Sequence, residues 1–488
     1  MYVKWETSCF PFFLIRILTV VVHFTTIFSL SKSPDTMQRT HTLSKYAAAF
    51  AILILSLCSF WLTSCNGNGN NEEETALNDT SGIPALLERK GELAKAAEWQ
   101  KTKEKVAELK ERITQNPNDV KARLQLATIY MVEARVTANP YYYQATFKIL
   151  DGVLDRDPNN FEAYTYKASV AMSLHRFADA KQLAEKAKSI NPDNAYVYGV
   201  LVDANVELGD YQKAIQMSDT MQMLKPSLEA YSRASYLREI FGDYNGAKQA
   251  MALAVQAGGP GSESAEWART TLGDLYLNTG NLDSAETLYK TTLQLRPNFT
   301  NAEMGLAKVE KARKHYDSSI KHTENAIRTI SEVGYVAFLA DVYELKGDND
   351  KAKEIRKDVI DQLEEGEKNQ LKGSVMQHNG NRELAQAYLA TNDLDKALQY
   401  AQNDLKLRPN NIDANELIAW IYYLKGDYAN AKMHADKMLA TNTQNANTLY
   451  KAGVIYKHSG DVAKGDMLIQ KATSVNKNID QKVLLAAK

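Results

Sequence analysis

Cysteine is nearly absent from this 488-residue chain. The three cysteines, Cys9, Cys58 and Cys65, all lie in the first 65 residues. The rest of the chain therefore has no disulfide, no thiol nucleophile and no cysteine metal site. An excess of charge is lacking as well, because 58 basic residues are balanced by 59 acidic ones. This balance favours neither nucleic acid nor an anionic membrane surface as a partner.

Motifs that carry catalysis are missing too. The sequence has no phosphate-binding loop, no nucleophile elbow and no paired-cysteine motif. Only His315 and His322 lie close together among the eight histidines, and no carboxylate–histidine metal spacing accompanies them. The glycine-rich segment 258–261 lacks the Lys-Ser/Thr of a phosphate cradle, so we expect a loop there. We predict no catalytic residue, no metal ligand and no cofactor, and we expect the protein not to be an enzyme.

What the sequence does contain is a repeated pattern, clearest at residues 272–297, LGDLYLNTGNLDSAETLYKTTLQLRP. It predicts two short amphipathic helices around a turn at Gly280, where a residue without Cβ can take a left-handed conformation. The second helix carries a small residue, Ala285, at its inner face and ends at Pro297.

The small residue of the second helix serves as a marker for the repeat. Most steps between markers are 33 to 35 residues, with longer steps of 38 and 45. The ten markers are Ala145, Ala180, Ala214, Ala247, Ala285, Ser319, Ala352, Ala397, Ala431 and Gly465. The prolines that close the units keep the same step, at Pro158, Pro192, Pro226, Pro260, Pro297 and Pro409.

This pattern resembles the tetratricopeptide repeat (TPR), a helix–turn–helix of 34 residues. The resemblance implies an all-α, right-handed α-solenoid of about ten units over residues 118–476, which needs no single large core. Residues 84–117 read as an N-terminal helical cap or a degenerate repeat, and residues 477–488 as a C-terminal capping helix. An insertion of about six residues, which includes 139–141, is expected to lengthen the turn of the first unit. Single units depart from the family pattern, at Asn205, Arg238 and Lys314.

An apolar stretch, 46–62, precedes the repeats and follows a basic segment with Arg39, His41 and Lys45. This order describes a secretory signal. The stretch ends in Leu-Thr-Ser-Cys65, which resembles the lipobox of bacterial lipoproteins and implies acylation of Cys65, with palmitate as one acyl chain, after removal of a signal peptide at 37–64. The alternative is an ordinary transmembrane anchor, since about 17 apolar residues just span a bilayer.

The residues on either side of the signal complete the N-terminal region. Met37 is a candidate start, which makes residues 1–36 an upstream extension; the alternative is an extra apolar membrane segment. Residues 65–83 are polar and predict a flexible tether. Its acidic run, 72–74, resembles the surface-export signal of Bacteroidota lipoproteins, and a solvated linker explains the run equally well.

The resemblance also implies a concave groove lined by the first helix of each unit, with the second, fifth, ninth and twelfth positions facing it. Aromatic side chains there would anchor a partner, and carboxylates would pair with its basic residues. In the alternative interpretation, the aromatics pack between units and the carboxylates are merely solvated. We expect Trp420 and Tyr423 to share the concave side and Tyr422 to turn into the stack. The groove candidates are Asp203, Tyr236, Trp267, Asp274, Lys308, Asp341, Trp420, Tyr423 and Tyr450.

These features predict a lipid-anchored TPR scaffold that binds a protein or peptide in a bacterial cell envelope, in the outer membrane, with assembly of an envelope complex as its setting. The fifth positions, such as Thr165 and Thr270, exclude the two-carboxylate clamp of TPR chaperone co-factors. One alternative is a carbohydrate-capture outer-membrane lipoprotein with TPR helices, but that class has long irregular insertions and this chain has few. A third possibility is a regulatory subunit that holds an enzyme at the membrane.

Overall fold

The computed structural model describes residues 69–78, 82–368 and 376–487. The expected upstream extension (1–36), the signal peptide (37–64) and the lipidation residue Cys65 lie outside these ranges. The described residues from Ala76 onward form one compact unit, and residues 69–75 belong to another. All structure below concerns the first unit, apart from α3 (Gly69–Leu77), which crosses the boundary between the two.

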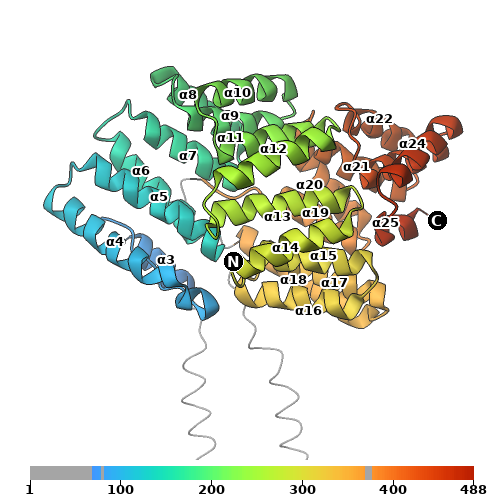
Figure 1. Cartoon of the computed structure of the whole chain (residues 1–488), viewed down its shortest axis with the longest axis horizontal. Helices are drawn as coiled ribbons and strands as arrows, with labels where there is room; N and C mark the ends of the chain where they lie inside the picture. Colours follow the sequence, from blue (N-terminus) through green and yellow to red (C-terminus); the bar gives the residue numbers. More distant parts are fainter. Residues whose placement is uncertain (1–68, 79–81, 369–375, 488) are drawn as a thin grey trace, which may run out of the picture. The chain divides into compact units, whose positions relative to one another are not determined.

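The predicted α-solenoid is confirmed: the described residues contain helices and no strand, and ten consecutive helix pairs follow one another along the chain (Figure 1). α4 (Ala97–Gln115) precedes the pairs, and α25 (Gln481–Ala486) follows them. The pairs are α5 (Val120–Thr137) with α6 (Tyr141–Leu154), α7 (Phe161–Ser173) with α8 (Phe177–Ile190), α9 (Ala195–Glu207) with α10 (Tyr211–Leu224), α11 (Leu228–Ile240) with α12 (Tyr244–Ala257), α13 (Glu263–Asn278) with α14 (Leu282–Leu295), α15 (Thr300–Ala312) with α16 (Tyr316–Thr329), α17 (Val333–Lys346) with α18 (Asn349–Lys368), α19 (Asn381–Ala390) with α20 (Leu394–Leu407), α21 (Ile412–Leu424) with α22 (Tyr428–Met438), and α23 (Ala446–His458) with α24 (Val462–Val475).

Small side chains set the spacing inside each pair. All ten marker residues are buried. Glycine does the same between neighbouring pairs, where the ring of Tyr289 on α14 lies between Gly273 on α13 and Gly305 on α15. A Cβ added to either glycine would lie within 2.5 Å of a carbon of this ring. The fully buried tyrosine therefore fills space that only glycine leaves open, and it ties one unit to the next.

The segment before the repeats differs from the expected helical cap. Residues 84–90 have no regular secondary structure, a 3-10 turn follows at Gly91–Lys95, and only α4 is α-helical. We call residues 83–90 the strap, because tyrosine hydroxyls of the first repeat bind its backbone. Tyr130 donates to the carbonyl oxygen of Pro84 (2.7 Å), and Tyr141 donates to that of Ala85 (2.6 Å). These tertiary bonds replace the backbone bonds that a helix would have made.

A buried ion pair fastens the C-terminal end of the strap. Both guanidinium nitrogens Nε and Nη2 of Arg89 donate to the carboxylate of Glu133 on α5, at 2.9 and 2.7 Å. Both side chains are almost fully buried, and the guanidinium also lies 4.9 Å from the centre of the Trp99 ring. Such a bidentate pair fixes orientation as well as charge.

Two further expectations need correction. Residues 69–77, within the expected flexible tether, form the helix α3. The insertion in the first unit lengthens α5 to 18 residues, so that the turn before α6 keeps only three residues. The longest step, by contrast, does extend a second helix, because α18 reaches 20 residues. Among the described residues, none of the helices has the length and apolar character needed to cross a bilayer.

The array winds back on itself, so that late units meet early ones. Asn379 N donates to Leu174 O (3.0 Å), and Asn476 Nδ2 donates to Leu277 O (3.1 Å). These contacts join residues about 200 positions apart, close to six TPR lengths. In Figure 1 the orange helices α19–α21 accordingly lie behind the green and yellow ones. We call this line of contacts, where the turns of early units meet the linkers of late units, the seam.

Candidate functional site: the concave face and the seam

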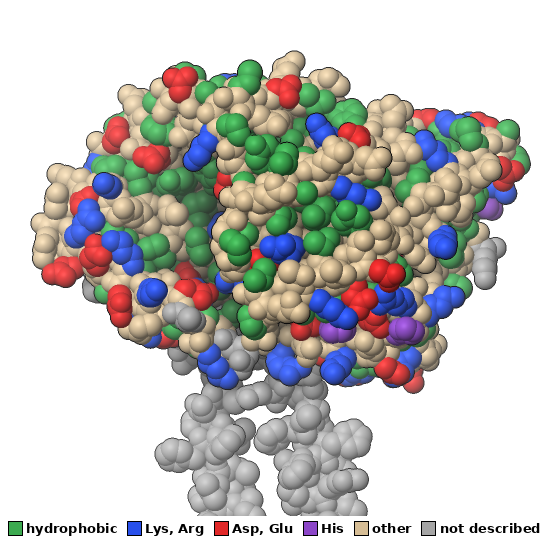
Figure 2. Space-filling model, in the orientation of Figure 1, with side chains coloured by type: hydrophobic (Ala, Val, Ile, Leu, Met, Phe, Trp, Pro, Cys, Tyr) green, Lys and Arg blue, Asp and Glu red, His purple; other side chains and the backbone are tan. Residues whose placement is uncertain are grey.

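The first helices of the pairs form an inner layer in two runs. One run leads from α5 through α7, α9, α11 and α13 to α15, and the other leads from α19 through α21 to α23, with each helix in contact with the next one of its run. No second helix in the described residues has a comparable contact with the second helix of the next unit. Figure 2 shows the surface hollowed, with hydrophobic side chains in the hollow, between the area of α5–α7 and that of α11–α13. The first helices therefore supply the concave face.

Two of the predicted groove aspartates are each paired with a cation one unit further along the chain. Arg233 on α11 donates to both carboxylate oxygens of Asp203, at 2.9 and 2.6 Å. Asp274 accepts from the Tyr289 hydroxyl (2.9 Å) and lies 3.3 Å from Lys308 Nζ, which is itself a predicted groove residue.

Asp341, the third predicted aspartate, is paired across the seam as well as within its unit. It lies 2.9 Å from Arg356 Nη2 and 2.5 Å from Lys482 Nζ. A basic partner side chain would have to compete with these internal cations. At these positions the structure therefore favours a role in joining units.

The structure buries two of the predicted groove aromatics, which corrects the expectation that they stand open. Trp420 is 6% exposed and Tyr423 is 8% exposed. Their rings stack on each other at 4.9 Å, so they do share one side of α21. Lys451 from α23 covers Trp420, and His458 packs edge-on against Tyr423. Side chains of the next unit therefore cover the side of α21 that was expected to face the groove.

The residue expected in the stack is less buried than these two. Tyr422 is half-buried, stacks on His434 and accepts a hydrogen bond from Gln402 Nε2 (3.2 Å). The other predicted aromatics vary: Tyr450 is half-buried, whereas Tyr236 and Trp267 are each 39% exposed. Tyr196 on α9, which the sequence analysis did not single out, is exposed to a similar degree and lies edge-on to Tyr166.

The charges of three carboxylates, Glu207, Glu239 and Asp413, act on Tyr236. Burial raises the pKa of Glu207 and of Glu239, and the attraction of Arg408 for Glu207 only partly opposes this. Asp413 on α21 is accessible to water but has protein on most sides, which raises the pKa of its carboxyl as well. The same surroundings, together with the charges of Asp413 and Glu207, raise the pKa of the Tyr236 phenol well above its usual value. The carboxyl groups near Tyr236 therefore carry negative charge that neighbouring cations do not fully balance.

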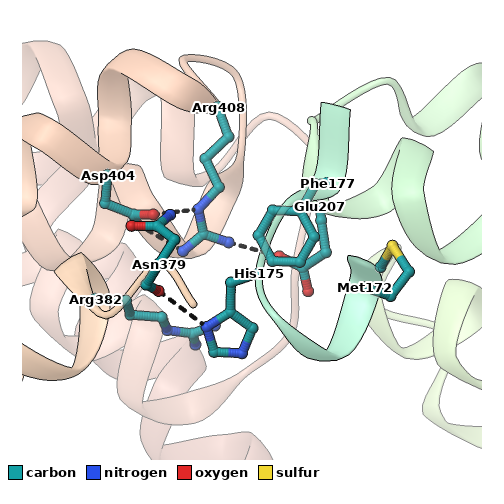
Figure 3. A pocket seen from close by; sticks show the side chains of 8 residues that line it. All are labelled: Met172, His175, Phe177, Glu207, Asn379, Arg382, Asp404 and Arg408. Atoms are coloured by element: carbon teal, nitrogen blue, oxygen red, sulfur yellow. Dashed lines mark hydrogen bonds and ion pairs between the residues drawn. The ribbon is translucent and has the colours of Figure 1, made fainter. Parts of the chain in front are cut away.

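A cavity of ≈ 180 Å³ lies on the seam nearby. Its walls come from the α7–α9 side and from the α19–α20 side, and Figure 3 shows Arg408 reaching from the second side toward Glu207 on the first. Arg408 donates to Glu207 (2.5 Å) and makes a bidentate pair with Asp404 (2.9 and 2.6 Å). The side chains of Arg408 and Asp404 are buried, so this trio is a charged joint inside the seam.

Sequence reasoning missed Glu207, Glu239, Arg408 and Asp413. Glu239 and Asp413 occupy the twelfth and second positions of their first helices, so the family register applied to every position would have found both. Arg408 and Glu207 lie 201 residues apart and come together only because the array winds back on itself. No local pattern carries that information.

Comparison with known proteins agrees with this geometry. Models of the tetratricopeptide repeat match residues 382–445 and 268–299. The chain contains tetratricopeptide repeats. No curated protein matches the sequence.

Several solved structures are similar to the chain at low sequence identity. A thermophilic TPR protein of Thermus thermophilus is 19% identical, with 41% of this chain and 99% of that chain covered and a TM-score of 0.34. Pseudomonas aeruginosa pilF is 15% identical, with 44% and 96% covered and a TM-score of 0.33. Human IFIT1, solved as a dimer with PPP-AAAA, is 14% identical, with 83% and 94% covered and a TM-score of 0.40.

Proposed function

We propose that this protein is a lipid-anchored, non-enzymatic TPR scaffold that binds a segment of another protein in a bacterial cell envelope. The observation that carries the proposal is the concave face itself. Its first helices expose the rings of Tyr196, Tyr236 and Trp267. Large rigid side chains of this kind dominate protein-binding energies.

The chemistry of the partner follows from the acidic groups beside Tyr236. Glu239 and Asp413 are held in surroundings that disfavour their charge. A lysine or arginine of a bound segment would relieve that cost, whereas a second carboxylate would raise it. We therefore propose a segment that combines basic residues with apolar or aromatic ones.

The lipid anchor rests on the apolar run 46–62 and the Leu-Thr-Ser-Cys65 sequence that ends it. In this proposal the outer membrane holds the acyl chains, and the repeats assemble or stabilise a complex beside it. Cys65→Ala should abolish labelling by a clickable palmitate. Undiminished labelling of that variant would refute the anchor and leave the repeat function standing.

The binding proposal is tested by capture from envelope extract with the full chain, followed by mass spectrometry and a binding titration of the captured protein. Tyr236→Ala and the double variant Glu239→Gln/Asp413→Asn should each weaken binding by about 30-fold, the loss typical of a strong interface residue. Leu253→Ala is the matched control, because Leu253 is a similarly exposed apolar residue on the second helix α12. Equal binding by all four proteins would overturn the assignment to the concave face.

A further inference from the structure

Three side chains with metal-binding atoms meet at the seam beside the cavity. His175 comes from the turn between α7 and α8, His378 precedes α19, and Glu383 lies in its first turn. They belong to units about 200 residues apart, which is why their spacing in the sequence did not suggest a metal site.

The distances fit coordination of one ion. A ligand atom from each of the three side chains lies within 4.8 Å of the other two. His175 Nδ1 and Glu383 Oε1 are 3.4 Å apart. In a tetrahedral site with bonds of about 2.0–2.1 Å, neighbouring ligand atoms are about 3.4 Å apart. Metal binding would replace the contact of His175 Nδ1 with the carbonyl oxygen of Asn379, now 3.3 Å.

The local charges favour a cation. The side chains around the site include the carboxylates of Glu383, Glu207, Asp404 and Asp413 against the guanidinium groups of Arg382 and Arg408. Glu383 Oε2 is buried and has no hydrogen-bond partner among the described residues. The excess of carboxylates and the unsatisfied oxygen are both what a bound divalent ion would correct.

We propose that His175, His378 and Glu383 bind a divalent transition-metal ion of the zinc type and that this ion joins the α7–α8 turn to α19 across the seam. Two imidazoles and one carboxylate are a ligand set that Zn²⁺ accepts, with the fourth position left for water. Because the ligands come from both sides of the seam, the ion would act as a reversible cross-link between early and late units.

The test uses the untagged full chain, with Zn²⁺ titrated calorimetrically and Co²⁺ followed by its visible absorption. We expect one ion per chain, a rise in melting temperature with Zn²⁺, and slower amide exchange in both the α7–α8 turn and α19. His175→Ala and the near-isosteric Glu383→Gln should each weaken binding by more than about tenfold, since even residues behind the ligands contribute 10–100-fold.

His322→Ala is the matched control, because His322 pairs with one carboxylate, Glu303 (2.7 Å), without a second histidine. It should bind metal like the parent protein. Each variant is first compared with the parent by circular dichroism without metal, and if one ligand variant is unfolded, the other carries the test. Absence of stoichiometric binding by the parent, or unchanged binding by a folded ligand variant, would overturn the proposal.

Discussion

Two kinds of contact hold the repeats of this protein, and they differ in chemistry. Between neighbouring helices the contacts are mainly apolar and close, as at Ala285 or around Tyr289. Across the seam a few apolar contacts, at Met376 and Ile412, are joined by polar ones from residues such as Arg408, Asn411 and Asn476. Apolar burial supplies most of the free energy of folding, whereas polar contacts mainly fix geometry. The comparison teaches that contacts within the stack mainly stabilise the units, whereas contacts across the seam mainly fix how distant units are placed. Each prediction below tests one of these two roles.

The largest effect is expected inside the stack, at Trp420. Trp420→Ala removes a buried ring and should lower the free energy of unfolding by about 3–5 kcal/mol. Amide exchange should rise in α19–α23 more than elsewhere. Trp267→Ala is the control, because the same side chain is 39% exposed there and its loss should cost about 0.5 kcal/mol or less. Equal melting temperatures of the two variants would mean that Trp420 is exposed in the groove and not buried in the stack.

Nearly as large an effect is expected at the charged joint of the seam. Arg408→Met leaves the carboxylates of Asp404 and Glu207 without their cation, which should cost about 3–5 kcal/mol. Exchange should rise in α9 as well as in α20, since the two sides lose the same partner. Lys425→Met, at an exposed ion pair with Asp395, should cost at most about 1 kcal/mol. A response confined to α20 would mean that the seam does not couple distant units.

A smaller effect is expected from one methyl group on the seam. Gly209 has φ +78°, and a Cβ there would lie 2.4 Å from the carbonyl carbon of Asn410. Gly426 has the same φ with nothing within 4 Å. Both alanine variants carry the left-handed backbone cost of about 1–2 kcal/mol. Gly209→Ala should cost about 1–3 kcal/mol more, from overpacking. Equal denaturation midpoints for Gly209→Ala and Gly426→Ala would mean that Gly209 lies further from Asn410 than the structure places it.

The smallest effect concerns pH. Burial raises the pKa of Glu239, so the folded state holds this proton at pH values where the unfolded chain has lost it. Stability from this group is therefore complete below the unfolded pKa and falls as pH rises through the folded pKa. Glu239→Gln, which keeps the oxygen that accepts from Asn278 (3.1 Å), should raise the melting temperature at pH 7 and have no effect in acid.

Glu416 on α21 is the opposite case, because its pKa is lowered. Burial opposes its ionisation, but the ion pair with Lys451 and the hydrogen bond from Thr448 outweigh burial and lower its pKa. Glu416→Gln should therefore destabilise at pH 7, with the difference fading as pH falls through the lowered pKa. Melting curves from pH 8 down to about pH 2 should show the two variants changing in opposite directions relative to the parent protein. Parallel changes would contradict both assignments.

The repeat and its register were predictable because each marker residue answers to a local requirement. A small residue such as Ala285 must sit where two helices touch, and this recurs in every unit. The strap was not predictable, because residues 84–90 have a helix-forming composition and are held out of a helix by distant side chains, the tyrosines of α5 and α6 and Glu133. The burial of Trp420 depends on Lys451 and His458 from the next unit, which a position within one unit does not reveal.

The strap gives the protein a defined response to tension. Any pull on the chain before Ile83 reaches the repeats through residues 83–90 before it reaches α4. The load first meets the bond from Lys148 Nζ on α6 to Leu77 O, then the hydroxyls of Tyr130 and Tyr141 and the buried Arg89–Glu133 pair, so it enters the first repeat before it reaches α4. The strap thus transfers tension on the N-terminal region to the first repeat, and α4 is spared.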